Sequence, residues 1–184
     1  MDRDSNTTKT FLPQQGRLSQ VRTLGDPVLR QRAHVVTDFD DRLERLADTM
    51  MDVMEREEGV GLAATQVGVL SRVMVWKHPD NADERYVFVN PEIVERSEAC
   101  CTLPEGCLSV PGATMEVPRA EEVVVAAQDL RGQAMTAHLT GILARIVQHE
   151  IDHLDGYLIL DRTSSEERRR VLKELRERAL SADS

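Results

Sequence analysis

The residues with the clearest chemical potential are the histidines of the segment 148–153 (QHEIDH). Side chains four residues apart lie about 40° apart around an α-helix, so His149 and His153 would point the same way. Two imidazoles in that arrangement can bind one metal ion. Glu150 follows the first histidine, where its carboxylate can take a proton from water at the ion. The segment therefore predicts a metal-dependent hydrolase.

The spacing alone leaves another interpretation open. A His pair with an acid between also occurs on solvent-exposed helix faces, where Asp152 would be an ordinary surface acid. The apolar residues around the motif favour the metal site, because buried histidines and acids need partners that satisfy them. A catalytic ion also needs a third protein ligand and an open position. No histidine follows His153, so the third ligand is expected upstream.

Two further segments carry candidate groups. Residues 105–112 (EGCLSVPG) are rich in turn formers and hold one cysteine, Cys107. A thiolate is a strong ligand for iron, zinc or cobalt, although a lone cysteine is more often a small buried apolar residue. Residues 59–68 (GVGLAATQVG) lack the Lys-Ser/Thr of a phosphate-binding loop. We interpret them as a loop packed against the site, with the Gln66 amide as an oxyanion donor or, alternatively, as a surface group.

Apolar periodicity predicts the elements that must position these groups. Helices are expected at about residues 40–57, 141–154 and 165–180, the second apolar around most of its circumference and therefore buried. Ser/Thr-x-x-Glu patterns at 163–166 and 164–167 mark the start of the third helix without fixing its register. Strands are expected at 72–77 and 86–89, and a hairpin at 121–128 and 133–139. This order, without βαβ alternation, predicts an α+β fold with antiparallel sheet.

Composition narrows the class of protein. A chain of 184 residues suits one domain, here 17–184, after a polar stretch at 1–16 that we expect to be a flexible tail. A net charge of −9 argues against DNA or RNA as the main partner. The sequence contains no run of 18 apolar residues, so no membrane span is predicted. The polar first 16 residues also do not fit a secretory signal. Three cysteines, two of them adjacent, favour a reducing cytoplasm over a disulfide framework.

Together the three segments resemble the peptide deformylase family. That family is marked by Gly-x-Gly-Leu-Ala-Ala-x-Gln, Glu-Gly-Cys-Leu-Ser and Gln-His-Glu-x-Asp-His in this order, and the chain has GVGLAATQ, EGCLS and QHEIDH at 59–66, 105–109 and 148–153. The resemblance covers roughly residues 20–175. It implies antiparallel sheets around a central metal-binding helix, plus a C-terminal helix. It also implies hydrolysis of the N-formyl group from the N-terminal methionine of new polypeptides, with release of formate.

The resemblance assigns roles to individual residues. Cys107, His149 and His153 match the ligands of one divalent ion, usually Fe²⁺, with Ni²⁺, Co²⁺ or Zn²⁺ as substitutes. Glu150 matches the general base, and Gln66 and the Leu108 N–H match the groups that hold the formyl oxygen. The expected substrate-binding residues are Val60, Gly61, Leu108, Ile142, Arg145 and Ile146. For Ile146, an ordinary position in the hydrophobic core is the alternative to a place in the substrate pocket. We expect the guanidinium of Arg145 to reach solvent. Supporting roles are expected for Glu105, Arg119 and Asp152, with Arg119 paired to Glu105.

Some features depart from the family or leave choices open. Thr114 stands where many relatives carry an arginine that helps to hold the peptide backbone, which leaves the strength of peptide and inhibitor binding open. Cys100 and Cys101 have no assigned role. The last helix docks on the ribosome in some relatives, but its mixed charges favour a solvated face with i,i+4 ion pairs. A monomer is expected. A zinc endopeptidase is disfavoured by EGCLS, and a non-catalytic metal-binding or ribosome-associated module is disfavoured by the intact Glu150 and Gln66.

Overall fold

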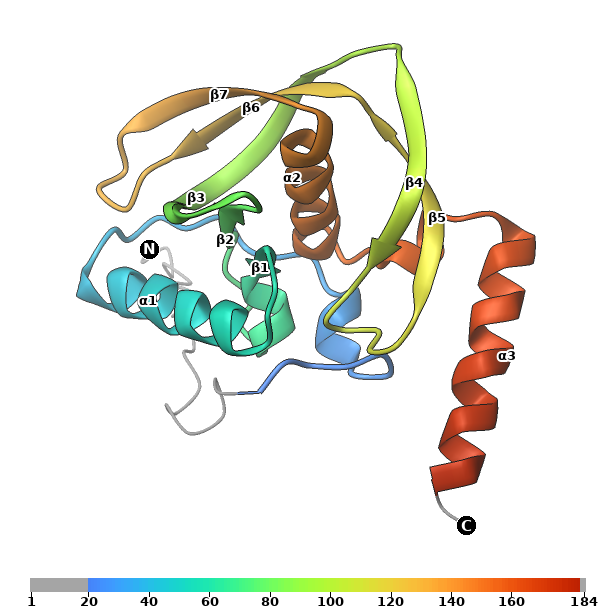
Figure 1. The fold of residues 1–184 in the computed structure, drawn as a ribbon. Helices are drawn as coiled ribbons and strands as arrows, with labels where there is room; N and C mark the ends of the chain where they lie inside the picture. The colour runs from blue at the N-terminus through green and yellow to red at the C-terminus, as the bar shows by residue number, and fades with distance from the viewer. Residues whose placement is uncertain (1–19, 183–184) are drawn as a thin grey trace, which may run out of the picture.

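Two antiparallel sheets lie on either side of helix α2 in the computed structural model, which describes residues 20–182 (Figure 1). The predicted tail at 1–16 lies outside the described residues. The larger sheet has the order β1-β2-β3-β6-β7. Its strands are Gly61–Ala63, Val73–His78, Asn81–Arg96, Glu122–Gln128 and Ala134–Thr140. The smaller sheet pairs β4 (Cys100–Gly106) with β5 (Thr114–Ala120). The α+β prediction is confirmed.

Helix α2 (Gly141–Leu154) forms over the residues predicted from its apolar pattern. Ala144, Val147, Ile151 and Leu154 pack into the main core with the inner face of the larger sheet. On another side of α2, Gln148 bonds both backbone groups of Ala120, accepting at 3.2 Å and donating at 2.9 Å. The helix is thus fixed to both sheets, which makes it a rigid support for the motif it carries.

Helix α1 (Asp41–Arg56) begins at the N-cap Asp40, whose carboxylate accepts from the Arg42 and Leu43 N–H groups. Its apolar face packs against β1, β2 and the following turn, through Leu43, Leu46, Met50, Val53 and Met54. Glu57 and Glu58 end the helix, and Glu58 has a φ of 56°. This turn delivers the chain directly to β1.

Helix α3 (Ser165–Ala182) is two residues longer than predicted at its end. The Glu167 N–H donates to Ser164 Oγ at 3.1 Å, which settles the capping register at 164–167. Short 3₁₀ helices cover Pro27–Arg30, Ala64–Val67 and Ile159–Asp161. No helix among residues 20–182 is long and apolar enough to span a membrane.

Several strands differ from the sequence predictions. Residues 59–68 are not a loop: β1 pairs with β2 and leads into the 3₁₀ helix Ala64–Val67. All three β1 residues are buried, so the alternation that reveals a strand is absent. Strand β3 is much longer than the predicted 86–89. Strands β4 and β5 were not predicted, since β4 is mostly exposed and each strand contains a proline.

Candidate active site

Three potential metal ligands converge where α2 passes the loop after β4. His149 and His153 lie one turn apart on α2, with their Nε2 atoms 3.2 Å from each other. Cys107 Sγ lies 3.2 Å from His153 Nε2, and the three ligand atoms all lie within 4.8 Å of one another. A tetrahedral ion with ordinary Zn–N and Zn–S bonds would set neighbouring ligand atoms about 3.3–3.7 Å apart. The donor set, one thiolate and two imidazoles, therefore fits a divalent transition metal ion.

The carboxylate of Glu105 orients the first histidine. Its Oε2 lies 3.0 Å from His149 Nδ1, and its Oε1 accepts from Arg119 Nε at 2.9 Å and Arg145 Nη1 at 2.7 Å. Burial raises the pKa of Glu105, but its bonds to His149 and Arg119 outweigh burial and hold that pKa at about 2. Glu105 is therefore ionised, and His149 Nδ1 carries the proton that it donates. In the neutral imidazole that binds a metal ion, the Nε2 lone pair then faces the ligand cluster.

Asp152 extends this support toward the surface. It accepts from Arg119 Nη1 at 2.5 Å and from Arg162 Nη2 at 2.5 Å. Among the described residues, Asp152 is connected to the ligand His149 through Arg119 and Glu105. The pair that the sequence suggested, Arg119 with Glu105, is bidentate and buried.

Glu150 is a buried acid whose carboxylate lies beside β1. Only 4% of the residue is exposed, and within the described part of the chain its Oε2 has no hydrogen-bond partner. Burial is the main cause that raises the pKa of this carboxyl to about 7. A Cβ at Gly61 would lie 2.5 Å from Glu150 Oε1, so the glycine leaves the space that the carboxylate occupies. A group with this pKa can both accept and return a proton near neutrality.

Gln66 presents its amide N–H₂ toward the same space. Its Oε1 accepts from the Ala63 N–H at 2.8 Å, and a backbone N–H can only donate, so the amide orientation is fixed. Its Nε2 then donates to Ser109 Oγ at 3.2 Å and retains a second hydrogen. Gln66 is 1% exposed. The alternative of a surface glutamine is therefore excluded.

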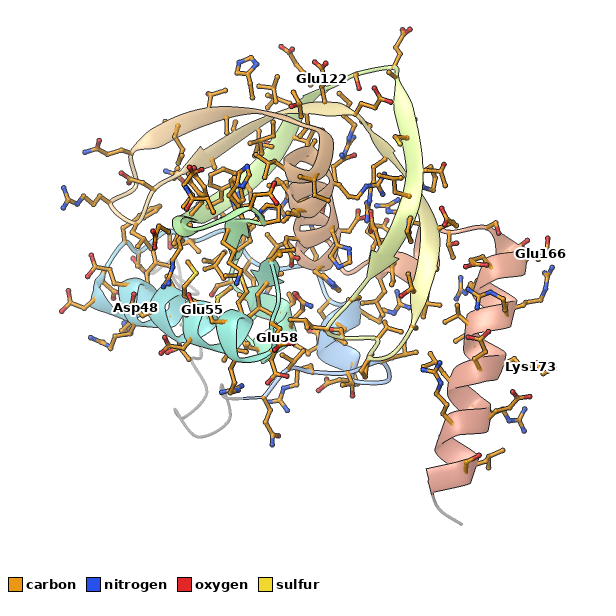
Figure 2. The ribbon with its side chains drawn as sticks, viewed as in Figure 1. Asp48, Glu55, Glu58, Glu122, Glu166 and Lys173 are labelled. Carbon is orange, nitrogen blue, oxygen red and sulfur yellow. The ribbon has the colours of Figure 1, made fainter. Side chains whose placement is uncertain are left out.

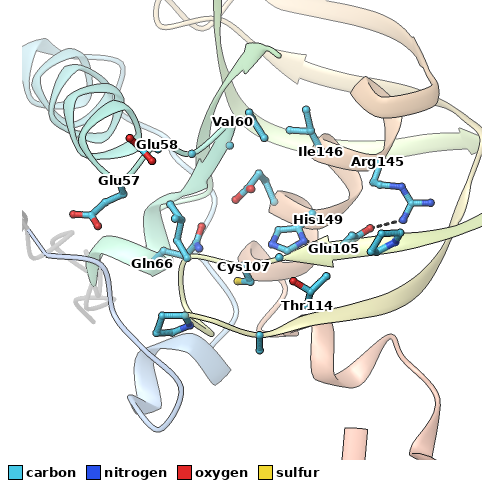
Figure 3. A pocket seen from close by; sticks show the side chains of 18 of the residues that line it. Glu57, Glu58, Val60, Gln66, Glu105, Cys107, Thr114, Arg145, Ile146 and His149 are labelled. Carbon is cyan, nitrogen blue, oxygen red and sulfur yellow. Dashed lines mark hydrogen bonds and ion pairs between the residues drawn. The ribbon is translucent and has the colours of Figure 1, made fainter. Parts of the chain in front are cut away.

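A cavity of about 680 Å³ is lined by five of these residues: Gln66, Glu105, Cys107, His149 and Glu150 (Figure 3). In that view Val60 and Ile146 lie across the upper part of the cavity, and Gln66, Cys107 and His149 lie below them. Val60 and Ile142 are 38% and 49% exposed at the mouth, whereas Ile146 is buried. All six residues expected to contact substrate line this cavity: Val60, Gly61, Leu108, Ile142, Arg145 and Ile146.

Comparison with known proteins decides the family. The family model for polypeptide deformylase matches residues 18–169. The chain belongs to the polypeptide deformylase family. It is 46% identical over 145 residues to the peptide deformylase of Natranaerobius thermophilus, covering 79% of this chain and 92% of that protein. It is 41% identical over 162 residues to peptide deformylase 2 of Streptomyces coelicolor, covering 87% and 90%.

Solved structures agree with this assignment. Peptide deformylase from Plasmodium falciparum superposes with a TM-score of 0.82 at 38% identity, covering 89% of this chain and 98% of that one. The Thermotoga maritima enzyme gives 0.75 at 41% identity, covering 79% and 97%. Membership makes the chain a hydrolase of the peptide deformylase class. The family implies removal of the N-formyl group from nascent peptides.

The structure corrects the expectation for Arg145. Its guanidinium does not reach solvent: the residue is 5% exposed and bonds Glu105 Oε1, the Val117 carbonyl at 2.9 Å and the Cys101 carbonyl at 2.6 Å. The Arg145 guanidinium turns inward because these acceptors form hydrogen bonds with its N–H groups. The bond to the Cys101 carbonyl also gives the backbone of this cysteine a structural contact.

Sequence reasoning missed other members of the deformylase site. Ser109 orients the Gln66 amide, and Thr65 Oγ1 donates to the His153 carbonyl at 3.1 Å. Their position inside two motifs was the only available signal. Further lining residues come from the α1 end and the β4–β5 hairpin: Glu57, Glu58, Gly59, Pro104, Gly106, Pro111, Gly112, Ala113 and Thr114.

Proposed function

We propose that this chain removes the formyl group from formyl-methionine at the N-terminus of nascent polypeptides, using one divalent metal ion held by Cys107, His149 and His153. The observation that carries the proposal is the buried carboxylate of Glu150, whose Oε2 has no hydrogen-bond partner among the described residues and which lines the same cavity as Cys107 and His149. Fe²⁺ is the proposed ion, with Ni²⁺, Co²⁺ or Zn²⁺ as substitutes. When bound, the ion supplies Lewis acidity toward the formyl oxygen and the attacking water.

The protein groups have distinct parts in the hydrolysis. Glu150 accepts a proton from the attacking water, whose oxygen bonds to the formyl carbon. Gln66 Nε2 and the Leu108 N–H donate hydrogen bonds to the oxyanion that develops. Glu150 then delivers its proton to the leaving amine as the carbon–nitrogen bond breaks, and formate departs. The retained hydrogen on Gln66 Nε2 supports this role, because Ser109 uses only the other one.

The edge of β1 supports binding of an extended peptide. The Val60 carbonyl accepts from the Lys77 N–H at 3.0 Å, and Gly61 lies opposite Trp76 in the next pair. Hydrogen-bonded and non-hydrogen-bonded pairs alternate in an antiparallel ladder, so the N–H and C=O of Gly61 point away from β2. A peptide backbone can pair there as an added strand. The methionine side chain would then contact the apolar walls formed by Val60, Leu108, Ile142 and Ile146.

The test compares blocked and unblocked peptides. Protein loaded with Fe²⁺ without oxygen should release formate from formyl-Met-Ala-Ser, and should leave acetyl-Met-Ala-Ser and Met-Ala-Ser intact. A metal-loaded protein that releases no formate would overturn the proposal and favour a non-catalytic module. Cleavage of internal bonds in an unblocked peptide would instead indicate an endopeptidase. Docking of α3 on the ribosome and a monomeric state stay predictions.

A further inference from the structure

The outer edge of β5 is covered by side chains of α3 and the turn before it. The carbonyl of Glu116 accepts from Thr163 Oγ1 at 2.8 Å, and that of Thr114 accepts from Arg170 Nη2 at 3.3 Å. The carbonyl of Gly112, just before the strand, accepts from Arg178 Nη1. These acceptors are two residues apart, the period at which strand carbonyls point the same way.

The strand register places these carbonyls on the edge of β5 that faces away from β4. Glu116 lies opposite Pro104, which has no N–H to donate, so this must be a pair without ladder hydrogen bonds. Thr114 lies opposite Gly106, two residues further along, and belongs to the same kind of pair. In such pairs the polar groups of both strands point outward. In Figure 1, β5 accordingly lies between β4 and α3.

The same register aims the other edge of the hairpin at the substrate cavity. Since Gly106 and Thr114 are directly opposite, the N–H and C=O of Gly106 point away from β5. Gly106 and Pro104 both line the cavity, as does Gly61 of β1. One edge of the hairpin is thus available to a peptide backbone while α3 occupies the other.

Helix α3 is itself fixed against the body. Val171 is 1% exposed in a cluster that includes Met115 of β5 and Ala113, which lines the cavity, with Cys107 and Leu175 packed against it. Arg170 is held by Glu167 at 2.5 Å and Glu174 at 2.7 Å. Figure 2 shows Glu166 and Lys173 on the opposite side of the helix, away from the hairpin. A two-stranded hairpin is marginal on its own, so its position depends on such contacts.

We infer that α3 braces the substrate site, with Arg170 and Arg178 as positioning residues that hold the β4–β5 hairpin where its inner edge binds the peptide. Neither residue touches the reacting atoms. The inference rests on the proposed function for its effect on peptide binding, but the brace itself is a structural property. The proposed brace gives α3 a structural role in addition to its solvent-exposed face of paired charges.

The experiment compares two double variants of the full-length, metal-loaded protein. Arg170→Met with Arg178→Met removes the two arginine donors. The matched control, Arg169→Met with Arg176→Met, removes the same charge from exposed positions of α3 that no hydrogen bond between described residues joins to β5. The readouts are amide hydrogen exchange over residues 112–117, and KM and kcat for formyl-Met-Ala-Ser.

The brace variant should exchange these amides about tenfold faster, since a local opening equilibrium changes by that factor per 1.4 kcal/mol. Its KM should rise about five- to tenfold while kcat stays within about twofold, because the peptide must then reorder the hairpin on binding. The control variant should match wild type in both readouts. Thr163→Val removes the third donor without altering charge, and it should increase the exchange rate by a smaller factor than the double variant. This variant keeps the brace testable even if the double variant loses α3 altogether.

Unchanged exchange over residues 112–117 in both the brace variant and Thr163→Val would overturn the brace. Faster exchange with unchanged KM would overturn the link to peptide binding. An effect on kcat alone would also contradict a positioning role. If wild type releases no formate, the proposed function fails, and the exchange comparison still decides whether α3 holds the hairpin.

Discussion

Replacement of Glu105 by glutamine tests the buried network behind the metal ligands. The Glu105 carboxylate has a pKa of about 2 in the folded protein, against an ordinary value of 4.5. A difference of about 2.5 pH units corresponds to about 3 kcal/mol at neutral pH. Loss of the charge would leave Arg145 buried without its anionic partner, whereas Arg119 retains Asp152. We therefore expect the free energy of unfolding to fall by about 3 kcal/mol, near the lower end for a broken buried pair.

The pH dependence of this loss follows from the sign of the shift. A depressed pKa in the folded state stabilises the protein above the unfolded pKa of about 4.5, and the contribution disappears as pH falls through about 2. Glutamine does not titrate at this position. The difference between wild type and Glu105→Gln should therefore shrink from about 3 kcal/mol at pH 7 to about half of that or less at pH 3.

Urea unfolding of the metal-free protein measures this difference. The single tryptophan, Trp76, is 2% exposed and stacks on Tyr86, so its fluorescence should report the loss of the core. Glu177→Gln, in an exposed ion pair with Lys173, is the matched control and should cost less than about 1 kcal/mol. A Glu105→Gln protein as stable as this control, or a loss independent of pH between 7 and 3, would refute the reasoning.

Three further changes test separate parts of the site. Gly61→Ala places a Cβ 2.5 Å from Glu150 Oε1 and should lower kcat about 100-fold or more with metal content unchanged, and a normal kcat would contradict the proposed fit. Cys107→Ser removes the thiolate and should weaken metal binding in equilibrium dialysis by at least about 100-fold; retention of full affinity would remove Cys107 from the ligand set. Gln66→Met should reduce kcat by about 100- to 1000-fold with little change in KM, and an effect on KM alone would argue against an oxyanion donor.

The sequence was sufficient where local patterns decide the structure. The limits of α2 follow from its apolar pattern and from Asp155-Gly156, which ends it. The hairpin between β6 and β7 was signalled by its turn, where Gly132 adopts a φ of 78°. The ligand cluster also followed from local spacing, because His149 and His153 share one helix face, and the resemblance supplied Cys107.

The remaining features depend on contacts between distant parts of the chain. The direction of the Arg145 head is set by Glu105, Val117 and Cys101, which lie 28 to 44 residues away. Strands β4 and β5 pair without an apolar pattern in β4, and their outer edge is closed by α3, about 50 residues later. No local pattern reports such partners, so the hairpin and its brace became visible only in three dimensions.

The central claim is that Glu150 moves the proton in a hydrolysis carried out beside the Cys107, His149 and His153 cluster. The most direct test measures formate release from formyl-Met-Ala-Ser by Fe²⁺-loaded wild type and Glu150→Gln, with metal content determined in the same samples. We predict one ion per chain in both proteins and a kcat about 100- to 10,000-fold lower in the variant. A metal-loaded Glu150→Gln protein that releases formate at the wild-type rate would contradict the account.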